Sequence, residues 1–326
     1  MTKPVKRLAI LALAAACALG GCTACAAPDD GPARYQVAMV AKSTETDFWK
    51  AVFVGAEAAA TEYNLDLTIT GPDTEEDYET QNAMIAQAVQ DGAQALVFSA
   101  IDYDANAPAI EAAAAQGVHI VVIDSDVNSQ SVATYIGTDN YLAGQMAAEA
   151  ALEGMPQGAL KVGIVNYDIN SANGQARELG AVDAFDASGR SEVVATIHTL
   201  AEAESARRDT LAMLRAHPEI NVLLAFNEPT SVGAAQAVEE LQLGDALWMV
   251  GFDSNLATVD ALQTGIVDAL ILQNTYEMGY FGVQSAYKLL AGQHSEVERH
   301  VDTATRIINR DNLFALESQK ILFPVS

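Results

Sequence analysis

The feature that most constrains this chain is a regular alternation of short apolar runs with amphipathic helical segments. Four apolar runs in the first half, at 35–40, 65–69, 95–98 and 119–123, have the length of buried strands. Segments 47–63, 77–91 and about 108–116 between them carry apolar residues at helical spacing. Continuous apolar strands that alternate with helices are typical of a parallel sheet covered on both faces.

The same pattern begins again after Asp139. Strands are predicted at 161–165, 192–196, 222–225, 248–251 and 269–272, and helices near 141–152, 176–185, 203–216 and 230–241. Two successive α/β units of similar size predict two lobes with one cleft between them. Ligands of open parallel sheets lie beyond the carboxyl ends of the strands, so the site is expected there.

The first 25 residues predict export from the cytoplasm. Lys3, Lys6 and Arg7 precede an apolar run at 8–19, which is too short to span a bilayer. Leu19-Gly20-Gly21-Cys22 then has the small residues before a cysteine that a lipoprotein-processing peptidase requires. We expect residues 1–21 to be a signal peptide, Cys22 to carry lipid, and residues 22–34 to be a flexible tether. A plain signal peptide, with Cys22 unmodified, is the alternative.

Composition limits the possible partners. Cleavage before Cys22 leaves 305 residues with 14 Lys and Arg against 43 Asp and Glu, a net charge of −29. Such a charge repels nucleic acid and anionic membrane surfaces. Of the three cysteines, only Cys25 would remain unmodified, in the tether, so no disulfide or cysteine-bound metal is expected in the folded part.

Polar and aromatic side chains gather at the ends of the predicted strands. Carboxylates, amides and an arginine match the hydroxyls of a polyol, and aromatic planes match the C–H faces of a sugar ring. Each residue also has a structural interpretation: Asp102 and Asp139 as helix N-caps, Phe48 and Trp49 as core residues, and Ser99 and Thr138 as turn hydroxyls. The full set is Lys42, Phe48, Trp49, Ser99, Asp102, Asp124, Thr138, Asp139, Arg177, Asn227, Phe252, Asp253 and Gln273.

In order along the chain, these residues carry a resemblance. From about residue 35 to 309 the chain resembles the type I periplasmic sugar-binding proteins, nearest in layout to the ribose-binding branch, which is also related to the effector domains of LacI-type repressors. The matching pieces are Phe48-Trp49, Ile123-Asp124, Ile136-Gly137-Thr138-Asp139-Asn140, Arg177-Glu178-Leu179-Gly180, Asn227-Glu228, Val250-Gly251-Phe252-Asp253 and Gln273.

The resemblance implies an α/β fold of two Rossmann-like lobes with parallel sheets, joined by a hinge of three crossing strands near Thr138, Gln273 and Asp302. The implied first lobe is 35–138 with 274–302, and the second is 139–273 with 303–326. Ligand contacts are implied for Phe48, Trp49, Asp124, Arg177, Asn227, Asp253 and Gln273, lesser polar contacts for Ser99 and Thr138, and an apolar wall for Phe252.

Three positions depart from the ribose-binding pattern. Ser125 replaces an arginine, Thr46 replaces an asparagine, and Lys42 stands where small hydroxyl residues are usual. The two lost sugar contacts argue against ribose itself. Two interpretations of Lys42 stay open: a surface residue paired with Glu45 or Asp47, or a contact for an acidic or phosphorylated ligand.

The predicted function is capture of a sugar outside the cytoplasm by a lipid-anchored monomer that delivers it to an ABC permease. The alternative is presentation of the sugar to a receptor kinase or chemoreceptor. Catalysis is not expected, because no nucleophile-and-base pair, Walker loop or dinucleotide fingerprint is present. No cofactor is expected. The five histidines lack zinc-ligand spacing, and Asp102–Asn106 lacks the later residues of a calcium loop.

Overall fold

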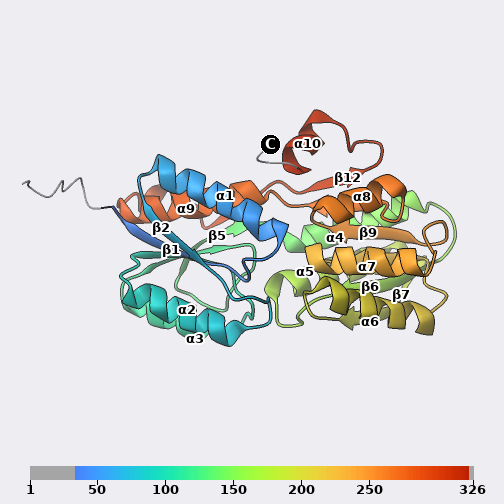
Figure 1. Cartoon of the computed structure of the whole chain (residues 1–326), viewed down its shortest axis with the longest axis horizontal. Helices are drawn as coiled ribbons and strands as arrows, with labels where there is room; N and C mark the ends of the chain where they lie inside the picture. Colours follow the sequence, from blue (N-terminus) through green and yellow to red (C-terminus); the bar gives the residue numbers. More distant parts are fainter. Residues whose placement is uncertain (1–33, 323–326) are drawn as a thin grey trace, which may run out of the picture. The chain divides into compact units, whose positions relative to one another are not determined.

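The computed structural model describes residues 34–322, in which two six-stranded sheets are each covered by helices (Figure 1). The predicted signal peptide, Cys22 and nearly all of the tether lie outside the described residues. Within 34–322, no helix is both long and apolar enough to cross a membrane.

The first sheet has the strand order β11-β5-β4-β3-β1-β2, and all its pairs are parallel. We call this sheet and the helices packed on it the first lobe. Its elements are β1 (Gln36–Val40), α1 (Asp47–Glu62), β2 (Asp66–Thr70), α2 (Tyr78–Gln90), β3 (Ala95–Phe98), α3 (Ala107–Ala115), β4 (His119–Ile123), β5 (Val132–Gly137), α9 (Thr275–Leu290), the 3₁₀ helix η1 (His294–Glu296) and β11 (His300–Asp302).

The second sheet has the order β12-β10-β9-β8-β6-β7, and only the β10–β12 pair among its described strands is antiparallel. This sheet and its helices form the second lobe. Its elements are α4 (Asn140–Gly154), β6 (Leu160–Asn166), α5 (Ala172–Ser188), β7 (Ser191–His198), α6 (Ala203–Ala216), β8 (Val222–Ala225), α7 (Glu228–Glu240), β9 (Trp248–Phe252), α8 (Leu256–Thr264), β10 (Ala269–Leu272), β12 (Arg306–Asn309) and α10 (Leu316–Leu322).

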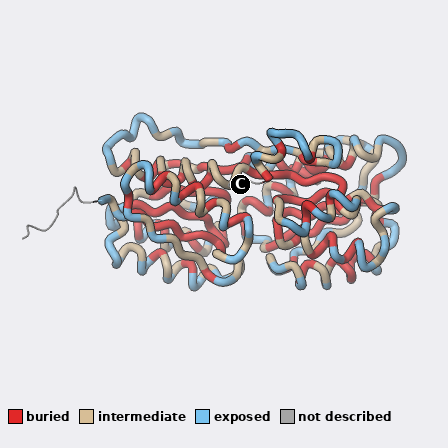
Figure 2. The backbone as a smooth tube through the Cα atoms, turned by 45° about the horizontal axis from the view of Figure 1, so that its top comes forward, coloured by how far each residue is buried: buried red, intermediate tan, exposed pale blue. Residues whose placement is uncertain are grey.

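The side-chain alternation of each strand divides every lobe into two cores. In β1, Val37 and Met39 face α1 and α9, whereas Ala38 and Val40 face α2 and α3. Figure 1 shows these helix pairs on opposite faces of the first sheet. The second sheet likewise packs on α4 and α5 on one face and on α6, α7 and α8 on the other. Figure 2 shows the buried residues following the strands of both sheets. Burial on both faces explains why the strands read as continuous apolar runs.

Within residues 34–322, the chain passes between the lobes three times: between β5 and α4, between β10 and α9, and between β11 and β12. The predicted fold class is therefore confirmed. Thr138 and Gln273, which lie at two of these passages, are joined by a hydrogen bond of 2.9 Å from Thr138 Oγ1 to Gln273 Oε1.

Two predicted helix caps have different outcomes. Asp139 is the N-cap of α4, and its carboxylate accepts the Leu142 N–H, so that interpretation is confirmed. The N-cap assigned to Asp102 is wrong, because Asn106 holds the cap position of α3. Asp102 instead accepts the backbone N–H groups of the next turn.

Candidate functional site

A cavity of about 20 Å³ lies where the carboxyl ends of strands from both lobes meet. This is room for about one water-sized group, so a larger ligand enters only when the walls of the cavity move apart. Its lining is Lys42, Thr46, Phe48, Trp49, Glu75, Asp124, Tyr167, Asn173, Arg177, Asn227, Glu228, Pro229, Asp253 and Gln273. A larger and mainly apolar hollow adjoins it and extends toward α8 and α10. The smaller cavity is the better candidate, because it gathers the buried polar groups.

Eight of the eleven residues predicted to contact ligand line this cavity: Lys42, Phe48, Trp49, Asp124, Arg177, Asn227, Asp253 and Gln273. The other three lie behind the lining. Ser99 donates a 2.9 Å hydrogen bond to Asp124, Thr138 bonds Gln273, and the Phe252 ring packs under Arg177. The structure thus brings the set together, and the ligand roles themselves stay predictions.

Asp124 and Asp253 occupy equivalent positions, directly after β4 and β9. Both have left-handed backbone conformations, with φ of 58° and 63°. Their N–H groups donate to Ile136 and Ile271 of the neighbouring strand. Non-glycine residues rarely adopt this conformation, and aspartate is one of the few that tolerates it. Such backbone strain clusters at ligand sites, because there it aims a side chain.

Burial controls the charge of Asp253. Desolvation raises the pKa of its carboxyl to about 7, although the Arg177 charge and a 2.8 Å hydrogen bond from Gln273 Nε2 both lower it. A ligand hydroxyl that donates to this carboxylate would stabilise the ionised form.

Arg177 lies in the second turn of α5 and is only 1% exposed. The helix begins at Ala172, earlier than the predicted start near residue 176. Arg177 Nε donates to Asn140 Oδ1 at 2.8 Å, Nη1 donates to the Phe226 carbonyl, and the guanidinium lies 4.7 Å from the centre of the Phe252 ring. Its Nη2 group is buried and has no partner among the described residues.

Asn227 offers a second buried donor. As the N-cap of α7, it accepts the Thr230 N–H through Oδ1, while its Nδ2 has no partner within the described part of the chain. A buried donor without a partner is costly, and such groups in folded proteins call for an explanation. Because Asn227 and Arg177 both line the cavity, an oxygen-rich ligand would satisfy their two unpaired donors.

The aromatic pair serves both the core and the cavity. Trp49 belongs to the first-lobe core and also lines the cavity, and its ring meets Phe48 edge to face with 5.1 Å between centres. Its indole Nε1 donates to Glu75 at 2.8 Å. Thr46, one of the departures from the ribose-binding pattern, is the N-cap of the same helix.

The surface interpretation of Lys42 is wrong. Its side chain is 2% exposed and forms its ion pair with Glu75 rather than with Glu45 or Asp47. It lies two residues beyond β1, and its side chain reaches the second lobe, where Nζ donates to Ser171 Oγ.

Direct polar contacts join the two lobes around the cavity. Glu228 of α7 accepts the Phe48 N–H of α1 at 2.8 Å, and Asn173 Nδ2 donates to Asp124 at 3.1 Å. Farther out, Glu76 accepts the Ala201 N–H. Burial raises the pKa values of the Glu228 and Glu76 carboxyls, because each has moved from water into a contact between lobes.

Six further residues line the cavity without having been predicted as ligand contacts: Thr46, Glu75, Tyr167, Asn173, Glu228 and Pro229. Tyr167 follows β6 directly, so the strand-end rule could have found it. Glu228 follows Asn227, a residue that was selected. Glu75 lies in an acidic loop, TGPDTEED, where no pattern distinguishes it from the carboxylates on either side.

Comparison with known proteins gives the family. The sequence model described as "periplasmic binding protein domain" matches residues 37–294. The chain belongs to the periplasmic binding protein family. This family works outside the cytoplasm, so the coarse prediction of an extracytoplasmic location is confirmed.

Two relatives and one solved structure define the branch. The D-ribose/D-allose-binding protein of Pseudomonas aeruginosa is 30% identical over 93% of this chain and 99% of its own length. The ribose import binding protein of Bacillus subtilis is 25% identical, with 79% and 83% covered. A carbohydrate transporter solute-binding protein of Agrobacterium radiobacter, solved with D-arabinose, superposes with a TM-score of 0.86 at 26% identity, covering 90% and 100%. These are sugar-binding transport proteins and not enzymes, which confirms the prediction that this family member is not an enzyme.

Proposed function

We propose that this periplasmic binding protein captures a sugar or sugar-like ligand in the cavity between its lobes and delivers it to an ABC-type importer. The observation that carries the proposal is the pair of buried, unpaired donors, Arg177 Nη2 and Asn227 Nδ2, in a cavity whose lining also has four carboxylates and three aromatic rings. Sugar hydroxyls both donate and accept, so they can satisfy all these groups at once.

Each residue has a role in this proposal. Arg177 and Asn227 donate to sugar oxygens, Asp124 and Asp253 accept from hydroxyls, and Trp49 with Phe48 covers a ring face. Gln273 bridges Asp253 and Thr138, which couples the site to the crossing strands. Ser99 and Phe252 act from behind by orienting Asp124 and Arg177.

Ligand capture is proposed to work by a shift between open and closed forms. The proposed moving units are residues 35–138 with 274–302 and residues 139–273 with 303–326. The ligand contacts both, Asp124 and Trp49 from one and Arg177, Asn227 and Asp253 from the other. It therefore binds the closed form better and increases its population.

Export and anchoring complete the proposal. Residues 1–21 direct export, Cys22 carries the lipid, residues 22–34 form the tether, and the protein acts as a monomer. The Bacillus subtilis relative is named as an import binding protein, and this supports transport over presentation of the sugar to a receptor kinase or chemoreceptor.

The test is a thermal-shift screen of the soluble form, beginning at Thr23, against pentoses, hexoses, sugar acids, sugar phosphates and polyols. A ligand that binds the native state raises the unfolding midpoint. We expect a clear shift with at least one sugar in the wild type. We expect no shift with Arg177→Ala, because the sugar then loses its buried cationic donor. No shift with any compound would overturn the proposal, and an unchanged shift in Arg177→Ala would overturn the assigned site.

A further inference from the structure

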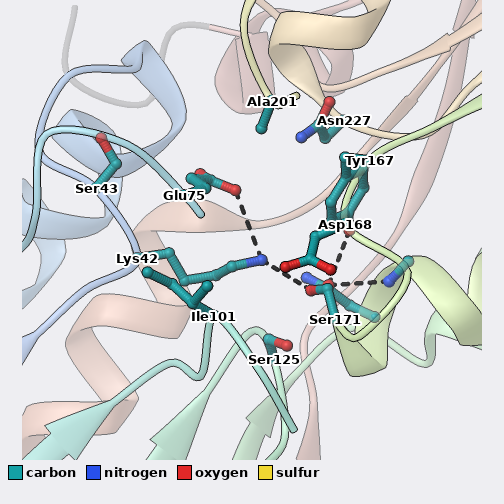
Figure 3. Close-up of polar contacts among 12 residues, drawn as sticks. Lys42, Ser43, Glu75, Ile101, Ser125, Tyr167, Asp168, Ser171, Ala201 and Asn227 are labelled. Carbon is teal, nitrogen blue, oxygen red and sulfur yellow. Dashed lines mark hydrogen bonds and ion pairs between the residues drawn. The ribbon is translucent and has the colours of Figure 1, made fainter. Parts of the chain in front are cut away.

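Lys42 and Glu75 form a buried ion pair in the lining of the cavity (Figure 3). Lys42 Nζ lies 3.5 Å from Glu75 Oε2, and the two side chains are 2% and 11% exposed. Figure 3 shows the end of the Lys42 side chain lying between Glu75 and Ser171. Both members line the cavity, so both can touch a ligand.

Neighbouring groups hold both members of the pair. Trp49 Nε1 donates to Glu75 Oε1 at 2.8 Å, which leaves Oε2 directed to the lysine. Lys42 Nζ donates to Ser171 Oγ at 2.9 Å and lies 5.1 Å from the centre of the Tyr167 ring. A lysine and glutamate held this way keep a fixed geometry instead of following the ligand.

The remaining charges of the cavity are predominantly negative. Its lining contains two cations, Lys42 and Arg177, against four carboxylates, those of Glu75, Asp124, Asp253 and Glu228. Glu75 neutralises Lys42, and Arg177 faces Asp253 and Asp124. An anionic ligand would therefore enter a site in which Lys42 is already paired with Glu75 and the carboxylates outnumber the cations. In a buried site such unbalanced charge is unfavourable.

We propose that Glu75 is a specificity-determining residue that excludes sugar acids and sugar phosphates by neutralising Lys42. The inference rests on the proposed function and deepens it, because it names the class of ligand that the site admits. It also predicts a switch. Removal of the Glu75 charge alone leaves the Lys42 ammonium uncompensated, and a carboxylate on the ligand can then take the place of Glu75.

The experiment compares the neutral sugar that gives the largest thermal shift with the uronic acid of the same stereochemistry, by isothermal titration calorimetry. Glu75→Gln is the main variant, because the amide oxygen can still accept from Trp49. Glu79→Gln, an exposed position on α2, is the matched control. We expect the wild type and the control to bind the neutral sugar and to reject the acid. In Glu75→Gln, we expect the Kd for the acid divided by the Kd for the neutral sugar to fall by about tenfold or more.

Lys42→Met is the second arm, and it serves also if Glu75→Gln does not fold. It leaves the Glu75 carboxylate facing the ligand without a cation, so discrimination against the acid should increase. A wild type that binds the acid as tightly as the neutral sugar, or a Kd ratio that neither variant changes, would overturn the inference. If the wild type binds no sugar at all, the proposed function fails and not this inference alone.

Discussion

Glu228 links the lobes independently of any ligand, and its replacement by glutamine tests whether that link favours closure. The carboxylate extends from α7 of the second lobe and accepts the Phe48 N–H at 2.8 Å and the Asp47 N–H at 3.4 Å, both at the N-terminus of α1 in the first lobe. Its Oε1 also accepts from Asn255 at 2.8 Å. The positive end of the α1 dipole adds to the attraction of this carboxylate.

The expected magnitude follows from these contacts. A hydrogen bond to a charged group contributes about 1.5–3 kcal/mol and a neutral one about 0.5–1.5 kcal/mol, so the amide loses about 1 kcal/mol at Phe48. The lost charge at the helix end removes about 0.3–1 kcal/mol more. Desolvation, which raises the pKa of Glu228, offsets part of this gain. We therefore expect a net loss of about 1 kcal/mol from the closed form, a factor of about five to ten in the closing equilibrium.

Isothermal titration calorimetry with the sugar identified by the screen measures the effect. If the open form predominates without ligand, the Kd of Glu228→Gln should rise by about the same five- to tenfold factor. The unfolding midpoint should change little, because each lobe keeps its own core. Glu239→Gln is the control, since this exposed residue lies on the same helix. A Kd for Glu228→Gln that equals that of the control would refute the reasoning.

Three further predictions concern other parts of the chain. Asp253→Asn should change the pH dependence of stability: the wild-type carboxyl, with a pKa of about 7 when folded and about 4 when unfolded, holds its proton more tightly in the native state. The stability of the wild type should therefore fall as pH rises from about 4 to 7, and the stability of the variant should lack this fall. Curves of the unfolding midpoint against pH that run parallel for the two proteins would contradict this prediction. Gly279→Ala should lower the free energy of unfolding, measured in urea, by about 2 kcal/mol. The reason is that the added Cβ would lie 1.9 Å from the Val52 carbonyl oxygen of α1. An unchanged free energy of unfolding would show that α1 and α9 can move apart to make room. Cys22→Ala should release the protein from membranes without changing ligand affinity, and lipid still incorporated into the variant would disprove the anchor.

The fold class was accessible from the sequence because burial on both faces makes a parallel strand apolar throughout. β3 and β8 occupy the predicted residues for this reason. Short elements with weak patterns were not predicted. β12 was not predicted because it has only four residues and pairs antiparallel at the edge of its sheet. α8 was not predicted because it is a short helix between two predicted strands.

The strand-end residues were also accessible, because the carboxyl ends of parallel strands meet at one edge of a sheet. Asp124, Asp253 and Gln273 each follow a strand that could be identified, so their place in the cavity follows from local sequence and chain topology.

Only the tertiary structure decided what surrounds those residues. Lys42 looks like a surface residue in the sequence, yet it is buried against Glu75 from the loop after β2 and Ser171 from the other lobe. Those partners are 33 and 129 positions away along the chain. A buried charge needs a partner, but local sequence does not specify which distant carboxylate supplies it. The kinds of side chain in the site can thus be predicted from the sequence. Which of them pair, and therefore the charge that a ligand contacts, depends on how the two lobes come together.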